Sequence, residues 1–165
     1  MDPAPRVTIR PARIEDAEAI NAIRRLPSSV EFTYALPDEP LEVTHRFLAS
    51  SGPDEHRLVA EVNGRVVGLA GLHRGTGKRR HSAAIGMGVH DEFQGRGIGR
   101  RLLEALLDLA DNQLGLARVE LEVMADNVRA IRLYETAGFR HEGRKRKAVA
   151  RQDGYVDLLM MSRLR

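Results

Sequence analysis

Residues 94–101 read Gln94-Gly95-Arg96-Gly97-Ile98-Gly99-Arg100-Arg101, and this stretch decides the fold of the chain. It follows a strand-like run at residues 82–89 and leads into the apolar period of an amphipathic helix. Its three alternating glycines lack the Cβ atoms that would keep a phosphate away from the backbone. A helix that begins there points unpaired N–H groups and its positive dipole end at the same spot. The stretch therefore predicts an anion cradle, in which we expect a pyrophosphate to bind.

Two other phosphate-binding motifs do not fit. A P-loop ends in Gly-Lys-Ser/Thr, and neither a lysine nor a hydroxyl follows Gly99. The dinucleotide fingerprint needs a further glycine three residues on, but Arg100 and Leu102 stand at those positions. That fold also places its glycine-rich turn after the first strand, whereas about ninety residues of this chain precede the cradle.

The spacing Gln-x-x-Gly-x-Gly at residues 94–99 resembles the acetyl-coenzyme A motif of the GNAT superfamily of N-acetyltransferases. Residues 127–139, Asn127-Val-Arg-Ala130-Ile-Arg-Leu133-Tyr134-Glu-Thr-Ala-Gly138-Phe139, resemble the Asn-x-x-Ala-x-x-Leu-Tyr-x-x-x-Gly-Phe signature of the same superfamily. The two motifs occur in the expected order, and the resemblance runs from residue 7 to the C-terminus. It implies an α/β (α+β) GNAT fold, with a central mixed, mostly antiparallel sheet of six to seven strands flanked by about four helices.

Length and composition agree with this fold. A chain of 165 residues is expected to form one domain, here an N-acetyltransferase domain over residues 1–165. Residues 1–6 lack the apolar stretch of a secretory signal, which favours a cytoplasmic protein without membrane contact. Since the chain has no cysteine, an acyl-cysteine intermediate is excluded and acetyl transfer is expected to be direct. Its six histidines form no His-x-x-x-His pair, so no metal site is expected.

The net charge of +3 is too small for a nucleic-acid stripe. Basic residues cluster at 78–80 and at 144–147, and neither cluster is interleaved with aromatics that stack bases. A solvated surface is the favoured interpretation, and contacts with coenzyme A phosphate or an anionic part of the acceptor are the alternative. We expect no nucleic-acid partner.

The pattern along the chain predicts strands at 7–10, 57–62, 65–74, 82–89 and 119–123, and helices at 16–26, 41–49 and 127–137. Asn63-Gly64 predicts a type I′ hairpin turn, and Gly138 a left-handed helix cap. A closing hairpin is expected from 139–147 and 155–162 around Asp153-Gly154. Residues 27–40, with three prolines, are expected to form a loop, which in the family lies over the acceptor pocket.

The resemblance also implies how the coenzyme is held. Its pantetheine arm would pair with the backbone of Met87, Gly88 and Val89. Gly86 and Gly88 predict either a bulge or a close approach on this strand, and a bulge would free the N–H of Met87 or Gly88 for the thioester carbonyl. Alternatively, both glycines merely fit beneath a neighbouring helix. The remaining contacts would come from the pyrophosphate cradle and from the residue that caps the next helix: Gln94, Gly95, Arg96, Gly97, Ile98, Gly99, Arg100 and Asn127.

Tyr134 occupies the position of the family's general acid. A phenol with a pKa of about 10 stays protonated at neutral pH and has a proton for the departing thiolate. The base is open, because residues 83–89 contain no carboxylate. Glu122 matches the position of the base in ribosomal-protein alanine N-acetyltransferases, and would act through water or with a raised pKa. A solvated or structural role for Glu122 is the alternative, as are His81 and His73 as bases.

The expected function is acetyl-coenzyme A-dependent acetylation of a small amine. The segments that most resemble bacterial L-amino acid N-acetyltransferases are Asp111-Asn112, Arg118-Val119-Glu120-Leu121, Glu142-Gly143, Gly154-Tyr155-Val156-Asp157 and Met161. Polyamine, phosphinothricin-type and ribosomal-protein N-terminal alanine acetyltransferases are alternatives, and so is a non-catalytic acyl-CoA-binding sensor. A homodimer is possible, as in many members of the family.

An L-amino acid with an apolar or aromatic side chain is the favoured acceptor. A polyamine site needs clustered carboxylates, and Glu31, Asp38, Glu39 and Glu42 form no contiguous acidic run. An amino acid needs a cation for its carboxylate, for which the candidates are Arg24, Arg25, Arg46, Lys78 and Arg79.

Overall fold

The computed structural model describes residues 6–50 and 52–165 and has one seven-stranded sheet in the order β1-β2-β3-β4-β5-β7-β6. Neighbouring strands are antiparallel except for β4 and β5, which are parallel. This confirms the mixed, mostly antiparallel sheet. The strands are β1 (Val7–Pro11), β2 (Glu55–Val62), β3 (Arg65–Arg74), β4 (Ser82–Val89), β5 (Arg118–Met124), β6 (Arg140–Arg151) and β7 (Gly154–Leu164).

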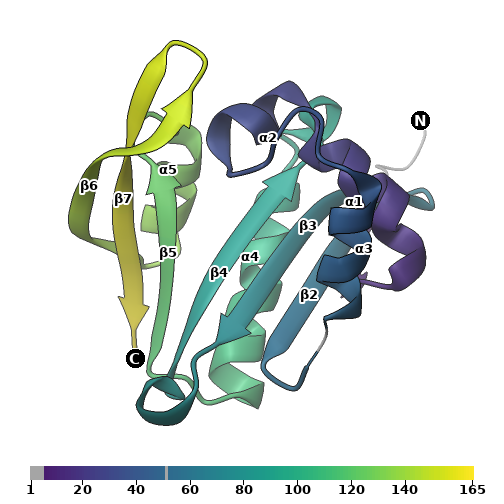
Figure 1. Ribbon diagram of the computed structural model, residues 1–165. Coiled ribbons are helices and arrows are strands. Elements are labelled where there is room, and N and C mark those ends of the chain that lie inside the picture. Colours follow the sequence, from purple (N-terminus) through teal and green to yellow (C-terminus); the bar gives the residue numbers. More distant parts are fainter. Residues whose placement is uncertain (1–5, 51) are drawn as a thin grey trace.

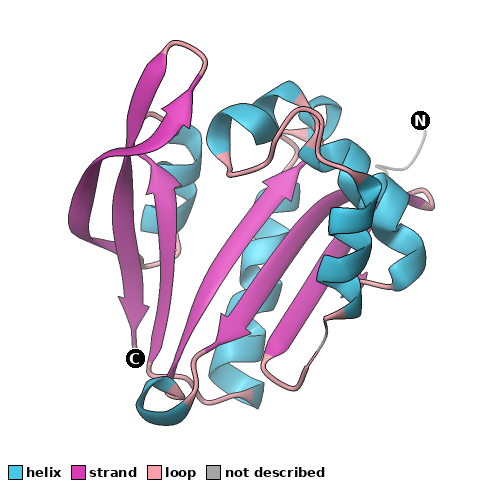
Figure 2. Cartoon of the chain, viewed as in Figure 1, coloured by secondary structure: helices cyan, strands magenta, loops and turns pink. Residues whose placement is uncertain are grey.

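Helices cover both faces of the sheet (Figures 1 and 2). Helices α1 (Ala17–Arg24) and α3 (Leu41–Ala49) lie in front of β2 and β3, while α4 (Ile98–Asp108) crosses behind. The short α2 (Pro27–Phe32) lies at the top of the gap between β4 and β5, and α5 (Val128–Thr136) lies behind β5. The main core forms where Leu102 and Leu106 of α4 bury their side chains against Val67, Leu72 and other residues of the sheet.

The central feature of the sheet is the parting of β4 from β5. The two strands pair only where Ser82–Ala84 of β4 meet Arg118–Glu120 of β5. Beyond that point they diverge, as Figure 1 shows, while β4 stays paired with β3 as far as Val89. One side of β4 therefore has no strand beside it over its last five residues.

Most of the predicted elements are present. The strand at 82–89 and the helix at 41–49 have the expected bounds. The turn between β2 and β3 has positive φ at Asn63 (50°) and Gly64 (79°), which confirms the hairpin. Gly138, with φ 92°, follows α5 as expected.

Two predictions need correction. Residues 27–32 form α2 rather than a loop, because Pro27 occupies the first turn, where a missing N–H costs nothing, and Ser29 Oγ donates to Ile23 O over 2.7 Å. The helix is too short to show an apolar period. The strand predicted to end at 147 continues to Arg151, since the register shifts between Lys145 and Val149, where Lys147 has φ 48°. This bulge interrupts the alternation that the prediction relied on.

No helix within residues 6–50 and 52–165 is long and apolar enough to cross a membrane. The expectation about a secretory signal rests on residues 1–6, of which 1–5 lie outside the described part of the chain.

Candidate functional site

A cleft of about 1180 Å³ occupies the gap between β4 and β5. The end of β4, the predicted cradle, β5, α5 and the segment around α2 all contribute to its walls. The two sequence motifs, at 94–99 and 127–139, are therefore brought to the same cavity.

The cradle has the geometry of an anion site. Gly95 and Gly97 have φ of 75° and 77°, a left-handed conformation that disfavours other residues. No backbone N–H from residue 95 to residue 100 donates to any residue in the described part of the chain, and a Cβ at Gly97 would meet nothing within 4 Å. The site thus offers several unpaired donors and the space for an anion beside them.

The third glycine of the motif has a different role. Gly99 lies inside α4, and a Cβ there would lie 3.6 Å from Leu133 Cδ2 and 3.8 Å from Val89 Cγ2. These are ordinary van der Waals distances. Gly99 therefore lies where α4 packs against α5 and β4.

The side chain of Gln94 is fully engaged with the protein. Its Nε2 donates to Ser28 Oγ (3.1 Å) and to Val89 O (3.2 Å), and its Oε1 accepts from Arg129 Nη1 (3.0 Å). Gln94 consequently links the cradle to α2, β4 and α5. Arg129 was not predicted from the sequence as a residue of the site.

The two arginines predicted in the cradle differ from each other. Arg100 lines the cleft and pairs with Glu104, with Nε and Oε1 3.0 Å apart. The guanidinium of Arg96 lies 5.1 Å from the centre of the Phe93 ring, and Arg96 is not among the residues that line the cleft.

The hydrogen bonds of β4 identify which groups face the gap. His90 N donates to Val67 O (2.8 Å) and Gly75 N donates to Ser82 O (2.9 Å), so the even-numbered residues of β4 pair with β3. In an antiparallel pair the alternate residues point their N–H and C=O the other way. The backbone groups of Ile85, Met87 and Val89 therefore face β5 across the cleft.

This geometry corrects the origin of the predicted oxyanion donor. The register between β3 and β4 is unbroken from Gly68–Val89 to Arg74–Ala83, so β4 has no bulge there. The N–H of Met87 is left free by the parting of β5 instead, whereas the N–H of the even-numbered Gly88 points at β3. A Cβ at Gly86 or Gly88 would meet nothing within 4 Å, so neither glycine lies beneath a helix. Both line the open cleft.

Tyr134 lies on the cleft wall and is only 7% exposed. Its ring makes an edge contact with Phe139, with centroids 5.8 Å apart. Burial raises the pKa of its hydroxyl to about 12. Nearby, Asn127 Oδ1 accepts from Ala130 N over 3.3 Å, which confirms its capping role.

Glu122 also lines the cleft, where it accepts hydrogen bonds from Lys145 Nζ and, over 2.8 Å, from Tyr34 Oη. The pairing with Lys145 lowers the pKa of the Glu122 carboxyl. The expectation of a raised pKa is therefore wrong. Of the alternative bases, His73 lines the cleft and is bonded to Glu55, whereas His81 is not among the lining residues.

Contacts from α2 bridge the gap between β4 and β5. Arg151 of β6 donates to Glu31 O over 2.9 Å and also pairs with Asp126. Phe32 packs on a small cluster formed by Met124, Val156 and Leu158. Sequence reasoning placed this segment over the acceptor pocket but missed these contacts, because they join residues about a hundred positions apart.

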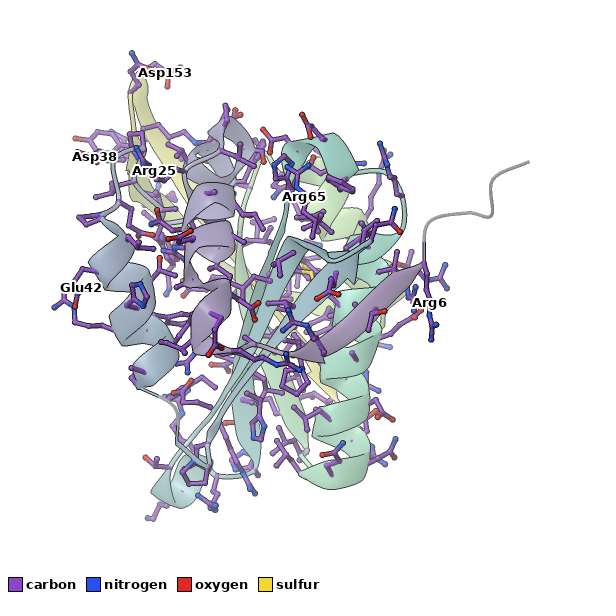
Figure 3. The ribbon with its side chains drawn as sticks, turned by 90° about the vertical axis from the view of Figure 1, so that its right-hand side faces the viewer. Arg6, Arg25, Asp38, Glu42, Arg65 and Asp153 are labelled. Carbon is purple, nitrogen blue, oxygen red and sulfur yellow. The ribbon has the colours of Figure 1, made fainter. Side chains whose placement is uncertain are left out.

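Only one of the five cations proposed for an acceptor carboxylate lines the cleft. It is Arg24, and its Nη2 already donates to Glu39 Oε1 over 2.9 Å. Arg25 donates to Pro37 O over 3.1 Å and lies beside Asp38 in Figure 3.

The carboxylates of the cleft come from strands and from the β5–α5 turn, and each is paired with a base. Glu55 pairs with Arg57, Glu122 with Lys145 and Asp126 with Arg151, while Arg118 serves both Glu120 and Glu142. The cleft therefore offers no cluster of unpaired acids within the described residues.

Comparison with known proteins agrees with this geometry. The model of the Acetyltransferase (GNAT) family matches residues 20–139. The L-amino acid N-acetyltransferase AaaT of Escherichia coli K12 is 32% identical over 160 residues, which are 96% of this chain and 98% of that protein. The N-alpha-acetyltransferase RimI of Mycobacterium tuberculosis is 40% identical over 120 residues, 71% of this chain and 72% of its own.

A solved structure is similar over nearly the whole chain. The structure of yncA from Salmonella typhimurium with its cofactor acetyl-CoA has 28% sequence identity and a TM-score of 0.81, and covers 96% of this chain and 93% of its own. Acetyl-CoA is the acetyl donor used by the GNAT family. The family match includes both motifs as well as β4 and β5. The chain therefore belongs to the GNAT family and is an N-acetyltransferase.

Proposed function

We propose that this chain binds acetyl-CoA in the cleft between β4 and β5 and transfers the acetyl group to the primary amine of an L-amino acid. The observation that carries the proposal is the unpaired edge of β4, which continues into the unpaired N–H groups of residues 95–100. Such an edge accepts a ligand as an added strand, while the cradle accepts a pyrophosphate. A single domain over residues 1–165 is consistent with one sheet that contains both β1 and β7.

The residues of the cleft fit direct transfer. The amine nitrogen attacks the thioester carbon, a C–N bond forms, and the C–S bond breaks. The N–H of Met87 faces the cleft and is the donor we assign to the developing oxyanion. Removal of one such donor typically costs about 3–4 kcal/mol of transition-state stabilisation.

Tyr134 is the group we assign to protonate the departing thiolate. Burial raises the pKa of its hydroxyl to about 12, which keeps the proton on the oxygen at neutral pH. The same burial raises the pKa of a thiol docked beside it, because desolvation disfavours every anion in the cleft. Proton transfer between the two is therefore less unfavourable than the Tyr134 pKa alone indicates.

Glu122 is suited to receive the amine proton through water. Its lowered pKa keeps it ionised, and a carboxylate of lowered pKa is too weak a base to strip an alkylammonium directly. The negative charge attracts the ammonium form of the acceptor, and the ionised carboxylate would accept its proton through a chain of waters as the nitrogen attacks.

The charges of the cleft favour an amino acid over a polyamine. Each lining carboxylate has a basic partner, so two or more added positive charges would have to displace existing ion pairs. Phe32, Tyr34 and Phe47 are among the aromatic side chains that line the cleft, and they offer contact to an apolar side chain. The Escherichia coli relative is named as an L-amino acid N-acetyltransferase, which agrees with this choice.

Gly97→Val is expected to abolish coenzyme A binding in a folded protein. The valine side chain would occupy the space beside the free N–H groups. Gly115→Val is the matched control, because Gly115 also has a positive φ (59°) and an open Cβ position but does not line the cleft. Calorimetry on the two folded variants decides the matter, and equal affinity for coenzyme A in both would remove the cradle assignment.

Tyr134→Phe is expected to lower kcat by about 100-fold with little change in coenzyme A affinity. Tyr155→Phe, at a 69% exposed tyrosine outside the cleft, is the control. The acid acts in its protonated form and its pKa is raised to about 12, so the wild-type rate should not fall between about pH 8 and about pH 10. A drop in kcat of less than about tenfold would assign thiolate protonation to water.

Among L-phenylalanine, L-methionine, spermidine and an alanine-initiated peptide, we expect one of the two amino acids to have the highest kcat/KM. The reason is that the carboxylates of the cleft are paired and its aromatic walls are apolar. Steady-state rates under one set of conditions test this. A kcat/KM for spermidine or the peptide that is about tenfold or more above that of both amino acids would overturn the amino-acid assignment. The assignment as an acetyltransferase would still stand.

A further inference from the structure

Arg129 brings a positive charge from α5 to the cradle. It belongs to the first turn of α5, lines the cleft, and its Nη1 donates to Gln94 Oε1 over 3.0 Å. Its Nη2 lies 2.9 Å from the position that a Cβ at Gly95 would take. The guanidinium therefore lies directly against the cradle loop, in the space that a side chain at residue 95 would fill.

No structural partner accounts for this charge. Within residues 6–50 and 52–165, Arg129 makes no ion pair with a carboxylate. A cation in the first turn of a helix is also disfavoured by the helix dipole. By contrast Arg100, the other arginine of the cradle that lines the cleft, is paired with Glu104. An anion bound beside Gly95 would compensate the charge of Arg129, which has no carboxylate partner, and would offset its unfavourable position at the start of α5.

Gln94 fixes where the guanidinium points. Both hydrogens of its Nε2 are used by Ser28 Oγ and Val89 O, so its Oε1 is turned toward Arg129. A guanidinium has five N–H donors, and the bond to Gln94 uses one of them. Most of the donors of Arg129 remain for a ligand.

We propose that Arg129 binds the diphosphate of the coenzyme together with the N–H groups of residues 95–100, and that Gln94 is its positioning residue. This inference rests on the proposed docking of acetyl-CoA in the cradle. Arginine suits the task because it makes paired, charge-assisted hydrogen bonds to phosphate oxygens. Arg96, an arginine of the motif itself, instead has its guanidinium over the ring of Phe93.

Calorimetric titration with coenzyme A and with dephospho-coenzyme A, which lacks only the 3′-phosphate, tests the proposal. Arg129→Ala is expected to weaken both ligands equally, by about tenfold to a hundredfold, the range of a hydrogen bond to a charged group. Arg129→Lys should recover part of the affinity. Arg132→Ala is the control, because Arg132 is an exposed arginine on the same helix that does not line the cleft. The affinity of the Arg132→Ala variant for either ligand should change less than about twofold.

A second comparison uses the contact between Arg129 and Gly95. Gly95→Ala and Gly97→Ala carry similar backbone strain, with φ of 75° and 77°, but only a Cβ at residue 95 meets Arg129. We expect Gly95→Ala to weaken coenzyme A less in an Arg129→Ala background than in the wild type. The effect of Gly97→Ala should be the same in both backgrounds.

The possible failures are distinct. If the wild type binds no coenzyme A, the proposed function fails. If the wild type binds but Arg129→Ala behaves like Arg132→Ala, the role of Arg129 is wrong and the proposed function stands. A loss that disappears with dephospho-coenzyme A would assign Arg129 to the 3′-phosphate and overturn the diphosphate contact.

Discussion

The parting of β4 from β5 is the constraint on which the rest of the site depends. Backbone N–H and C=O groups inside a sheet are nearly always paired, because an unpaired buried group costs free energy. Here the pairing ends after Ala84, and the groups of Ile85, Met87 and Val89 face a cleft instead of a strand. Within the protein, Val89 O has a substitute partner in the amide of Gln94. The remaining groups are available to water or to a ligand that lies along the strand.

The charges around the cleft hold its far wall to α2. Glu122 accepts from Tyr34 of the segment after α2 and from Lys145 of β6, while Arg151 connects β6 to Glu31 of α2. The bonds of Tyr34 and Arg151 join the segment around α2 to the β5–β6 side of the gap, so they tie the two sides of the cleft together. Lys145 also compensates the negative charge of Glu122.

The two motifs allowed the family, the cradle and the capping role of Asn127 to be predicted, because each depends on residues close in sequence. Long-range features were not accessible in this way. The N–H of Met87 is left without a strand partner by the position of β5, about thirty residues later, rather than by a local bulge. The pKa of Glu122 is lowered by Lys145 of another strand, so its local polar pattern gave no sign of it. Helix α2 was missed because a single turn and a half shows no period, and Arg129 because its partner Gln94 lies 35 residues away.

Residue-resolved amide hydrogen exchange along β4, with and without coenzyme A, tests the central claim most directly. In the free protein, the amides of Met87 and Val89 should exchange rapidly while those of Gly86 and Gly88, which pair with β3, are protected. Coenzyme A should then slow exchange at Met87 and Val89 by at least about tenfold, with little effect on the two glycines. Protection of Met87 in the free protein, or no change there on binding, would contradict the account of β4 as an unpaired edge that receives the coenzyme.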